Sequence, residues 1–512
     1  MESLAELDHR YLWHPFTQMR DWLKTEPIVL VRGRGAELMD DRGRKYLDAN
    51  SSIWTNLHGH NHPRINRAIV QQLGKIAHSS ALGFANEPAS QLGKALILAA
   101  SPTASSAAAA DTKKNPRTAL SKVFFSDDGS TAMEVALKLA FETARRSGRA
   151  RKPRFLSLQN AYHGDTVGAV SLGHIDLFHK AYSPLLFKSD KVMAPYCYRC
   201  TFNRTKPERA DARQYRKCNW ECLAQLEQKC AIKRRGGEPY AGFVFEPSMQ
   251  GAAGMIPQPK GWLQRACGIA RENGALLIAD EVMTGFGRTG SAQTQSTFAE
   301  SNDVPGSSPP LRPSTRMSRV PVRSPLFACH HEDVQPDLMA LAKGLTGGYL
   351  PMAATLSSQA VFDSFLGEYE DFKTFFHGHS FTGNQLGAAS ALASLEMLQE
   401  PASTTARVQL ENALTQQLGQ LWQHPQVGDI RQAGLIAGIE LVEDWKTRKP
   451  FDLRQRAGMR VCEAMARRGV LTRPVGNVVV LMPPYCTTEK QVKRMVAVLG
   501  ESIAETLQGK SP

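Results

Sequence analysis

Short apolar runs alternate with longer segments of helical periodicity along most of the chain. The segment STAMEVALKLAFETARR (130–146) carries apolar residues at the spacing of an amphipathic helix. Five apolar runs have the length of buried strands and end at polar residues or glycines: KVFFS (122–126), RFLSL (154–158), AGFVFE (241–246), ALLIAD (275–280) and LMALAK (338–343). This alternation predicts an α/β fold with a largely parallel sheet.

The pattern changes after about residue 399. A helix, a pair of strands and a further helix follow, and the strands include GLIAGIELV and NVVVLMPP. We predict a large domain over 61–395 and a smaller C-terminal domain over 396–512. Three stretches, 100–118, 190–237 and 291–325, interrupt the large domain and are predicted to be loop insertions, since two of them are low-complexity or rich in Pro, Ser and Arg.

Length and charge narrow the class of protein. A chain of 512 residues exceeds the size at which single hydrophobic cores stop growing. Of the formal net charge of +14, the stretch 190–237 alone supplies +7, from twelve Lys/Arg against five Asp/Glu. No nucleic-acid-binding motif accompanies that charge, so we expect a basic surface and no nucleic-acid partner.

No apolar run reaches the roughly 20 residues that cross a bilayer, and the N-terminus lacks the apolar core of a signal peptide. We therefore expect a cytoplasmic protein without a membrane partner. The nine cysteines are scattered, which favours reduced thiols over a disulfide framework.

Four cysteines of the basic insertion form a pattern of their own. Cys197, Cys200, Cys218 and Cys222 are spaced C-x2-C-x17-C-x3-C, close to the spacing of a structural zinc site. Because the second pair is spaced loosely, we expect reduced thiols and no metal.

Two strand ends predict a ligand beyond the carboxyl edge of the sheet, where open α/β sheets bind their ligands. Gly129 and Ser130 open a helix directly after a strand, so its first N–H groups suit a phosphate, although an ordinary N-cap explains them as well. Asp280 ends a buried strand, where a carboxylate needs a cationic partner or a ligand.

The third strand end carries Lys343, followed by glycines that allow a ligand to approach closely. A lysine in a partly apolar pocket has a lowered pKa and reacts with aldehydes. A phosphate cradle, a carboxylate suited to a pyridinium nitrogen and an amine suited to an aldehyde together indicate pyridoxal phosphate. Tyr162 or His163 is a candidate aromatic cover for its ring.

Several motifs resemble the class III, or ω-, aminotransferase family: AYHGDT, LLIADEVMTGFGRTG, PDLMALAKGLTGGYLP and HGHSFTGNQLGAAS. YLWHPFTQM, SSIWTNLHGHNHP and LTRPVGNVVVLMPP narrow the resemblance to the branch that aminates 8-amino-7-oxononanoate in biotin biosynthesis. The resemblance implies the type I aminotransferase fold, with residues 1–60 joining the small domain, and a homodimer whose active sites lie at the interface.

The resemblance also implies residue roles. Lys343 would bind the cofactor covalently and relay protons, Asp280 would pair with the pyridinium nitrogen, and Tyr162 would stack on the ring. Gly129 and Ser130 would bind the phosphate, which His379 and Ser380 of the other subunit would also reach. The implied substrate-binding residues are Phe16, Ile53, Trp54, Tyr162, Lys343, Gly378 and Arg473, with Arg473 clamping the substrate carboxylate.

Departures from the family pattern bear on the amino donor. S-adenosylmethionine is the usual amino donor in the family. In this chain, Phe16 stands in place of a tyrosine, Ile53 in place of a tryptophan, and His379-Ser380 in place of a Pro-Thr pair. These departures favour lysine as a rival donor. Asp128 stands where the family has serine, beside the expected phosphate. Aminotransferases of ornithine, 4-aminobutyrate or diamines, and a cofactor-binding regulator without turnover, are the alternatives.

Overall fold

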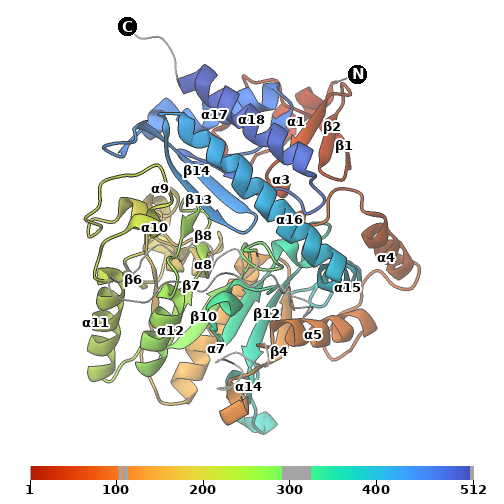
Figure 1. Cartoon of the computed structure of the whole chain (residues 1–512). Helices are drawn as coiled ribbons and strands as arrows, with labels where there is room; N and C mark the ends of the chain where they lie inside the picture. The colour runs from red at the N-terminus through yellow and green to blue at the C-terminus, as the bar shows by residue number, and fades with distance from the viewer. Residues whose placement is uncertain (1, 103–107, 109–112, 291–324, 508–512) are drawn as a thin grey trace, which may run out of the picture.

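The computed structural model describes residues 2–102, 108, 113–290 and 325–507 (Figure 1). The predicted insertion 291–325 lies outside the described residues except for its last position, and so does most of the stretch 103–112 within the insertion 100–118.

A seven-stranded sheet forms the centre of the molecule. Its order is β4-β12-β11-β10-β7-β5-β6. β12 runs antiparallel to both of its neighbours, and the remaining neighbouring pairs are parallel. The strands are β4 (Leu120–Ser126), β5 (Phe155–Leu158), β6 (Asp190–Val192), β7 (Gly242–Phe245), β10 (Leu276–Asp280), β11 (Leu338–Leu341) and β12 (Ala353–Ser358). The predicted α/β class is confirmed, and each of the five predicted strands is present.

Helices cover this sheet because each has one apolar stripe to bury. The predicted helix after β4 is α7, which packs against β11 and β12, whereas α11 and α12 pack against each other (Figure 1). The helices are α1 (Leu4–Tyr11), α2 (Met19–Trp22), α3 (Ser51–Trp54), α4 (Pro63–Leu73), α5 (Glu87–Ala100), α7 (Gly129–Arg146), α8 (Val167–Leu172), α9 (Asp176–His179), α10 (Ala212–Tyr215), α11 (Glu221–Arg235), α12 (Trp262–Glu272), α14 (Gln359–Asp363), α15 (Gln385–Gln399), α16 (Pro401–Leu418), α17 (Ala457–Arg467) and α18 (Glu489–Leu507).

The two ends of the chain meet in a second sheet, of order β1-β2-β3-β16, in which β16 from the C-terminal part pairs in parallel with β3. A third sheet has the order β13-β14-β18-β17, with β15 on β14, and β8 pairs with β9. The strands are β1 (Leu30–Arg34), β2 (Glu37–Asp40), β3 (Lys45–Asp48), β8 (Met249–Gln250), β9 (Ile256–Pro257), β13 (Val427–Ala433), β14 (Ile436–Asp444), β15 (Lys449–Pro450), β16 (Val470–Leu471), β17 (Pro474–Val475) and β18 (Val478–Leu481).

The basic stretch 190–237 contains regular structure. It begins with β6 at the edge of the central sheet and contains α10 and α11. Of the helices in the described part of the chain, none combines the length and the apolar character needed to cross a membrane.

Candidate active site

A cavity of about 890 Å³ opens beyond the carboxyl ends of β10 and β11. Parallel strands end at this edge of the sheet, which is where α/β folds place ligands. The cavity brings together residues from both chain ends and from the central sheet. Nine residues predicted from the sequence line it: Phe16, Ile53, Trp54, Gly129, Ser130, Tyr162, Asp280, Lys343 and Arg473.

Lys343 follows β11 by two residues and projects its amine into this cavity. Its φ is +46°, a left-handed conformation that is costly for a residue with a side chain. Nζ lies 4.6 Å from the centre of the Trp54 ring. Burial lowers the pKa of Lys343, and the negative charges of Asp280 and Glu246 only partly oppose that effect. A larger fraction of this amine is therefore neutral and nucleophilic than for an ordinary lysine.

Asp280 meets a hydrogen-bonding partner at its buried position. Its Oδ2 lies 2.8 Å from Nδ1 of His163, and its Oδ1 accepts a hydrogen bond from the Val282 N–H at 3.1 Å. His163 is buried in this contact, which leaves Tyr162 as the aromatic candidate to cover a ring. The carboxylate is thereby held at the cavity with a fixed orientation.

The N-terminus of α7 also lines the cavity. Gly129 allows the start of α7 to pack closely against the residues after β10, because a Cβ at this position would lie 2.8 Å from Cγ1 of Val282. The Ser130 hydroxyl accepts a hydrogen bond from the Asp165 N–H at 3.1 Å, so its own proton is free to be donated to an anion.

Asp128 caps α7. Its carboxylate accepts a hydrogen bond from the Thr131 N–H at 2.9 Å, and the Thr131 side chain completes the capping box. This contact explains how a carboxylate is accommodated beside the expected phosphate site, because one of its oxygens is committed to the helix end.

Aromatic side chains form one wall of the cavity. Phe178 contacts Phe16 with ring centres 5.3 Å apart and Tyr162 with ring centres 6.4 Å apart. The Tyr162 hydroxyl donates to Asp165 at 2.6 Å, and burial, together with this hydrogen bond, raises the pKa of Tyr162. Tyr162 therefore stays protonated and acts as an apolar plate with a fixed orientation.

Ile53 and Trp54 lie in a backbone segment that the sequence does not reveal. Four consecutive residues, 51–54, have φ between +46° and +69°. Asp48 stabilises this turn, since its carboxylate accepts hydrogen bonds from the N–H groups of Asn50 and Ser52 at 3.2 and 3.0 Å. The turn directs Trp54 toward Lys343.

Arg473 lies exposed at the mouth of the cavity. It forms no ion pair with any residue that the structure describes, so its guanidinium is available to a substrate carboxylate. Arg456, which the sequence did not single out, lines the same mouth and pairs with Asp21 at 3.0 Å.

Gly378, His379 and Ser380 are the predicted residues that do not line the cavity of their own chain. His379 Nδ1 lies 3.3 Å from Oδ2 of Asp127, a lining residue, so this segment reaches the rim. Their proposed contact with the phosphate of a second subunit stays a prediction.

Glu246, the last residue of the predicted strand 241–246, also lines the cavity. It directly follows β7, is buried at the cavity, and accepts hydrogen bonds from the N–H groups of Gly251 at 2.7 Å and Tyr162 at 3.4 Å. Burial raises its pKa to about 7. Its position at a strand end was the available signal; its burial was not visible in the sequence.

These residues fit pyridoxal phosphate. The first N–H groups of α7 and the Ser130 hydroxyl suit its phosphate, Asp280 suits its ring nitrogen, and the desolvated Lys343 amine suits its aldehyde.

The model of the family described as aminotransferase class-III matches residues 19–306 and 323–503. The adenosylmethionine-8-amino-7-oxononanoate aminotransferase of Geobacter sulfurreducens is 43% identical over 502 residues, covering 98% of this chain and 97% of that protein. The protein of the same name from Methanocaldococcus jannaschii has a crystal structure that superposes with a TM-score of 0.82 at 35% identity, covering 98% of this chain and 99% of the other.

The omega transaminase of Pseudomonas jessenii in complex with PMP superposes with a TM-score of 0.82 at 27% identity, with 99% of each chain covered. An amine transaminase from an uncultivated Pseudomonas species in its PLP-bound form is 29% identical, with a TM-score of 0.79, over 97% of this chain and 98% of that one. The predictions of an aminotransferase fold and of pyridoxal phosphate as cofactor are confirmed. The chain belongs to the class III aminotransferase family.

Proposed function

We propose that this protein transfers an amino group to 8-amino-7-oxononanoate and so forms 7,8-diaminononanoate for biotin biosynthesis. The observation that carries the proposal is the desolvated Lys343 amine facing Trp54, in a cavity that also holds Asp280 and the open N-terminus of α7. Relatives at 36–43% identity over almost the whole chain carry the name of this activity.

Bound pyridoxal phosphate supplies the aldehyde and the electron sink for amino transfer. Lys343 would hold the cofactor through its neutral amine and would move protons to and from the donor and acceptor carbons. Asp280, oriented by His163, would pair with the ring nitrogen and favour its protonated form. Arg473 binds the acceptor carboxylate at the mouth, and Trp54 and Phe16 exclude water from the reacting atoms.

We propose S-adenosylmethionine as the amino donor, following the names of the relatives. Lysine is the second candidate, because Phe16 offers no hydroxyl at the cavity wall and Ile53 offers no aromatic ring. Both residues line the cavity in which donor and acceptor alternate, so they are placed to discriminate between the two donors.

We further propose a cytoplasmic homodimer that acts on small molecules and binds neither nucleic acid nor membrane. Large apolar side chains at 376 and 381 are 75% and 58% exposed on either side of the His379 segment. A second subunit that covered them would bring this segment to its own cavity.

The test is to supply the reconstituted enzyme with 8-amino-7-oxononanoate and either S-adenosylmethionine or lysine, and to measure 7,8-diaminononanoate. We expect product with S-adenosylmethionine and none from Lys343→Ala with either donor. Product with lysine alone would assign the second donor. Turnover of ornithine, 4-aminobutyrate or diamines without any 7,8-diaminononanoate would refute the proposed acceptor, and full cofactor binding without turnover of any amine would indicate a regulator.

A further inference from the structure

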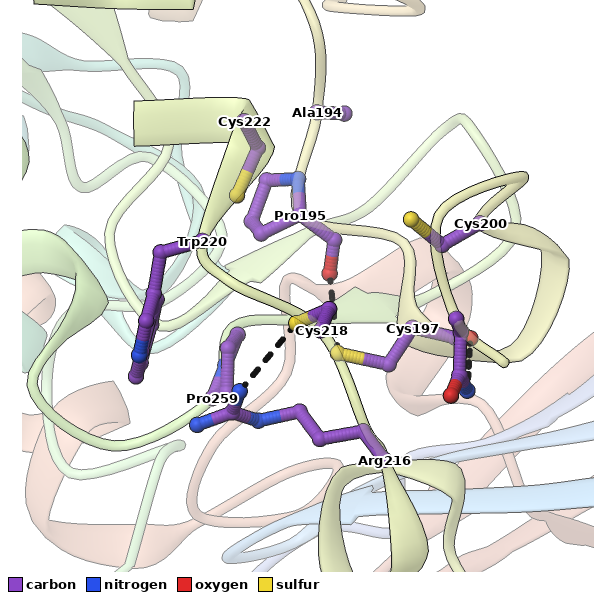
Figure 2. Close-up of a pocket in the computed structure, with 10 residues that line it drawn as sticks. Ala194, Pro195, Cys197, Cys200, Arg216, Cys218, Trp220, Cys222 and Pro259 are labelled. Atoms are coloured by element: carbon purple, nitrogen blue, oxygen red, sulfur yellow. Dashed lines mark hydrogen bonds between the residues drawn. The ribbon is translucent and has the colours of Figure 1, made fainter. Parts of the chain in front are cut away.

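The four cysteines of the basic segment surround one small cavity that shares no lining residue with the active-site cavity (Figure 2). Cys197 and Cys200 lie on the loop after β6, Cys218 lies on the extended chain before α11, and Cys222 lies in the first turn of α11. Figure 2 shows all four side chains arranged around the same space. The cavity measures about 20 Å³, room for one water-sized sphere.

The backbone conformation explains how Cys218 and Cys222 lie close to Cys197 and Cys200 although they are loosely spaced in the sequence. Trp220, between Cys218 and Cys222, has a φ of +61° and turns the chain directly into α11. Arg216 lies over the Trp220 ring at 4.0 Å and supports this turn. Both cysteines of the pair therefore line the same cavity despite the extra residue between them.

Asn203 holds the two cysteine-bearing segments together. Its amide nitrogen donates to the Cys197 carbonyl at 3.0 Å, and its side-chain oxygen accepts from the Lys217 N–H at 3.0 Å. The Arg204 N–H donates to the Lys217 carbonyl at 3.1 Å. The approach of the cysteine pairs is thus set by the backbone and does not depend on the thiols alone.

Hydrogen-bond donors around the cavity suit thiolate sulfur. The Arg216 guanidinium donates to the Cys218 sulfur at 3.4 Å. The fully buried Trp262 indole N–H lies beside Cys222 and has no hydrogen-bond partner of good geometry among the described residues. Metal-bound thiolates have surroundings of this kind, because donors stabilise their charge.

We propose that Cys197, Cys200, Cys218 and Cys222 bind a structural zinc ion. Four sulfur ligands in two close pairs match the closed tetrahedral sites of structural zinc. As the side chains stand, the described residues contain no group of three or more His, Cys, Asp or Glu closed tightly enough to hold a metal ion. Binding therefore requires the thiols to lose their protons and rotate inward. This assignment replaces the expectation of four free thiols.

The ion would stabilise the contact between this segment and the sheet containing β14. The Tyr196 hydroxyl donates to Glu440 of β14 at 2.6 Å, and the Arg199 guanidinium donates to the same carboxylate at 2.7 Å. Both residues flank Cys197 in sequence, so a metal that fixes Cys197 and Cys200 also fixes these two donors.

The first experiment is elemental analysis of full-length holoenzyme expressed with added zinc and passed through a chelating column. We expect about one zinc per chain. Cys200→Ser and Cys222→Ser should lose that zinc and melt at a lower temperature, whereas Cys486→Ser, at an exposed cysteine outside the cluster, should keep both. Retention of zinc in both cluster variants would place the metal elsewhere and overturn the proposal.

The second experiment uses the unaltered protein, so it does not depend on the variants folding. Expression with cobalt should give the visible absorption of a tetrahedral cobalt–thiolate centre, at wavelengths longer than those of the cofactor. Each of three results would contradict a zinc site. The protein could be free of metal with nine titratable thiols, it could form two disulfides under reducing preparation, or it could bind iron together with sulfide.

Discussion

At the scale of single residues, the active site contains backbone conformations and buried ionisable groups that are energetically unfavourable elsewhere in a protein. Lys343 combines a left-handed backbone with a desolvated amine, and Glu246 is a buried carboxyl whose pKa burial raises to about 7. Such states persist only where surrounding packing holds them, and they concentrate where chemistry is performed. The two groups are also coupled, because the charge of Glu246 raises the pKa of Lys343.

Glu246 predicts a pH dependence of stability for the cofactor-free protein. Its pKa is raised, so between pH 4.5 and about 7 the folded state holds a proton that the unfolded state has lost, and stability falls as the pH rises. Glu246→Gln should remove this loss, which is at most ~3 kcal/mol. Urea unfolding of the wild type and of Glu246→Gln at pH 5 and pH 7.5 measures this loss of stability. An equal pH dependence of the unfolding free energy in the two proteins would contradict the raised pKa of Glu246.

Phe16 predicts a change of donor preference. In Phe16→Tyr a hydroxyl is added at the exposed edge of the cavity wall without loss of the contact with Phe178. One new hydrogen bond to S-adenosylmethionine should raise the ratio of kcat/KM for that donor over lysine by about fivefold. Phe141→Tyr, on α7 and outside the cavity, is the matched control. An unchanged ratio would exclude Phe16 as a donor-selecting residue.

At the scale of elements, strand ends and helix starts position the chemistry. β10 and β11 deliver Asp280 and Lys343 to one edge of the sheet, and α7 places its first N–H groups at that same edge. The helix can approach because Gly129 has no Cβ and Val282 occupies the space beside it. The proposed phosphate site therefore depends on a packing contact between α7 and the residues after β10.

Gly129→Ala should disrupt that contact. The new Cβ would lie 2.8 Å from Val282, so the start of α7 must shift away from the cavity. We expect cofactor affinity to fall by about tenfold or more, since a loss of 1.4 kcal/mol already gives that factor. Titration of the cofactor-free protein with pyridoxal phosphate measures it. Gly268→Ala, within α12 and with no atom near its Cβ, should leave the affinity unchanged.

At the scale of the whole molecule, one chain encloses most of a site, and the His379 segment reaches only its rim. The cavity draws on residues near position 16, on the central sheet and on residues near position 473, so folding alone assembles these distant parts. Gly378, His379 and Ser380 remain outside it. In the proposed symmetric dimer, this segment would lie at the partner's cavity.

Mixed dimers test this arrangement. Lys343→Ala removes the nucleophile, and Ser380→Asp would place a negative charge against the phosphate; each variant alone should be inactive. If Ser380 acts on the other subunit, refolding the two variants together should restore about a quarter of wild-type activity, because half of the dimers are mixed and each has one intact site. No recovery, with mixed dimers verified by mass spectrometry, would place Ser380 in the site of its own chain.

The sequence by itself determined the α/β class, the strands before Asp280 and Lys343, the helix at Gly129 and the cofactor, because strand burial, helix periodicity and residue chemistry are local properties. Only the tertiary structure showed that His163 contacts Asp280 and that Asp128 caps a helix. It also showed that the turn at residues 51–54 points toward Lys343 and that the four cysteines line one cavity. Each of these depends on a long-range contact or on a backbone conformation that surrounding packing stabilises, and residue type alone does not specify either.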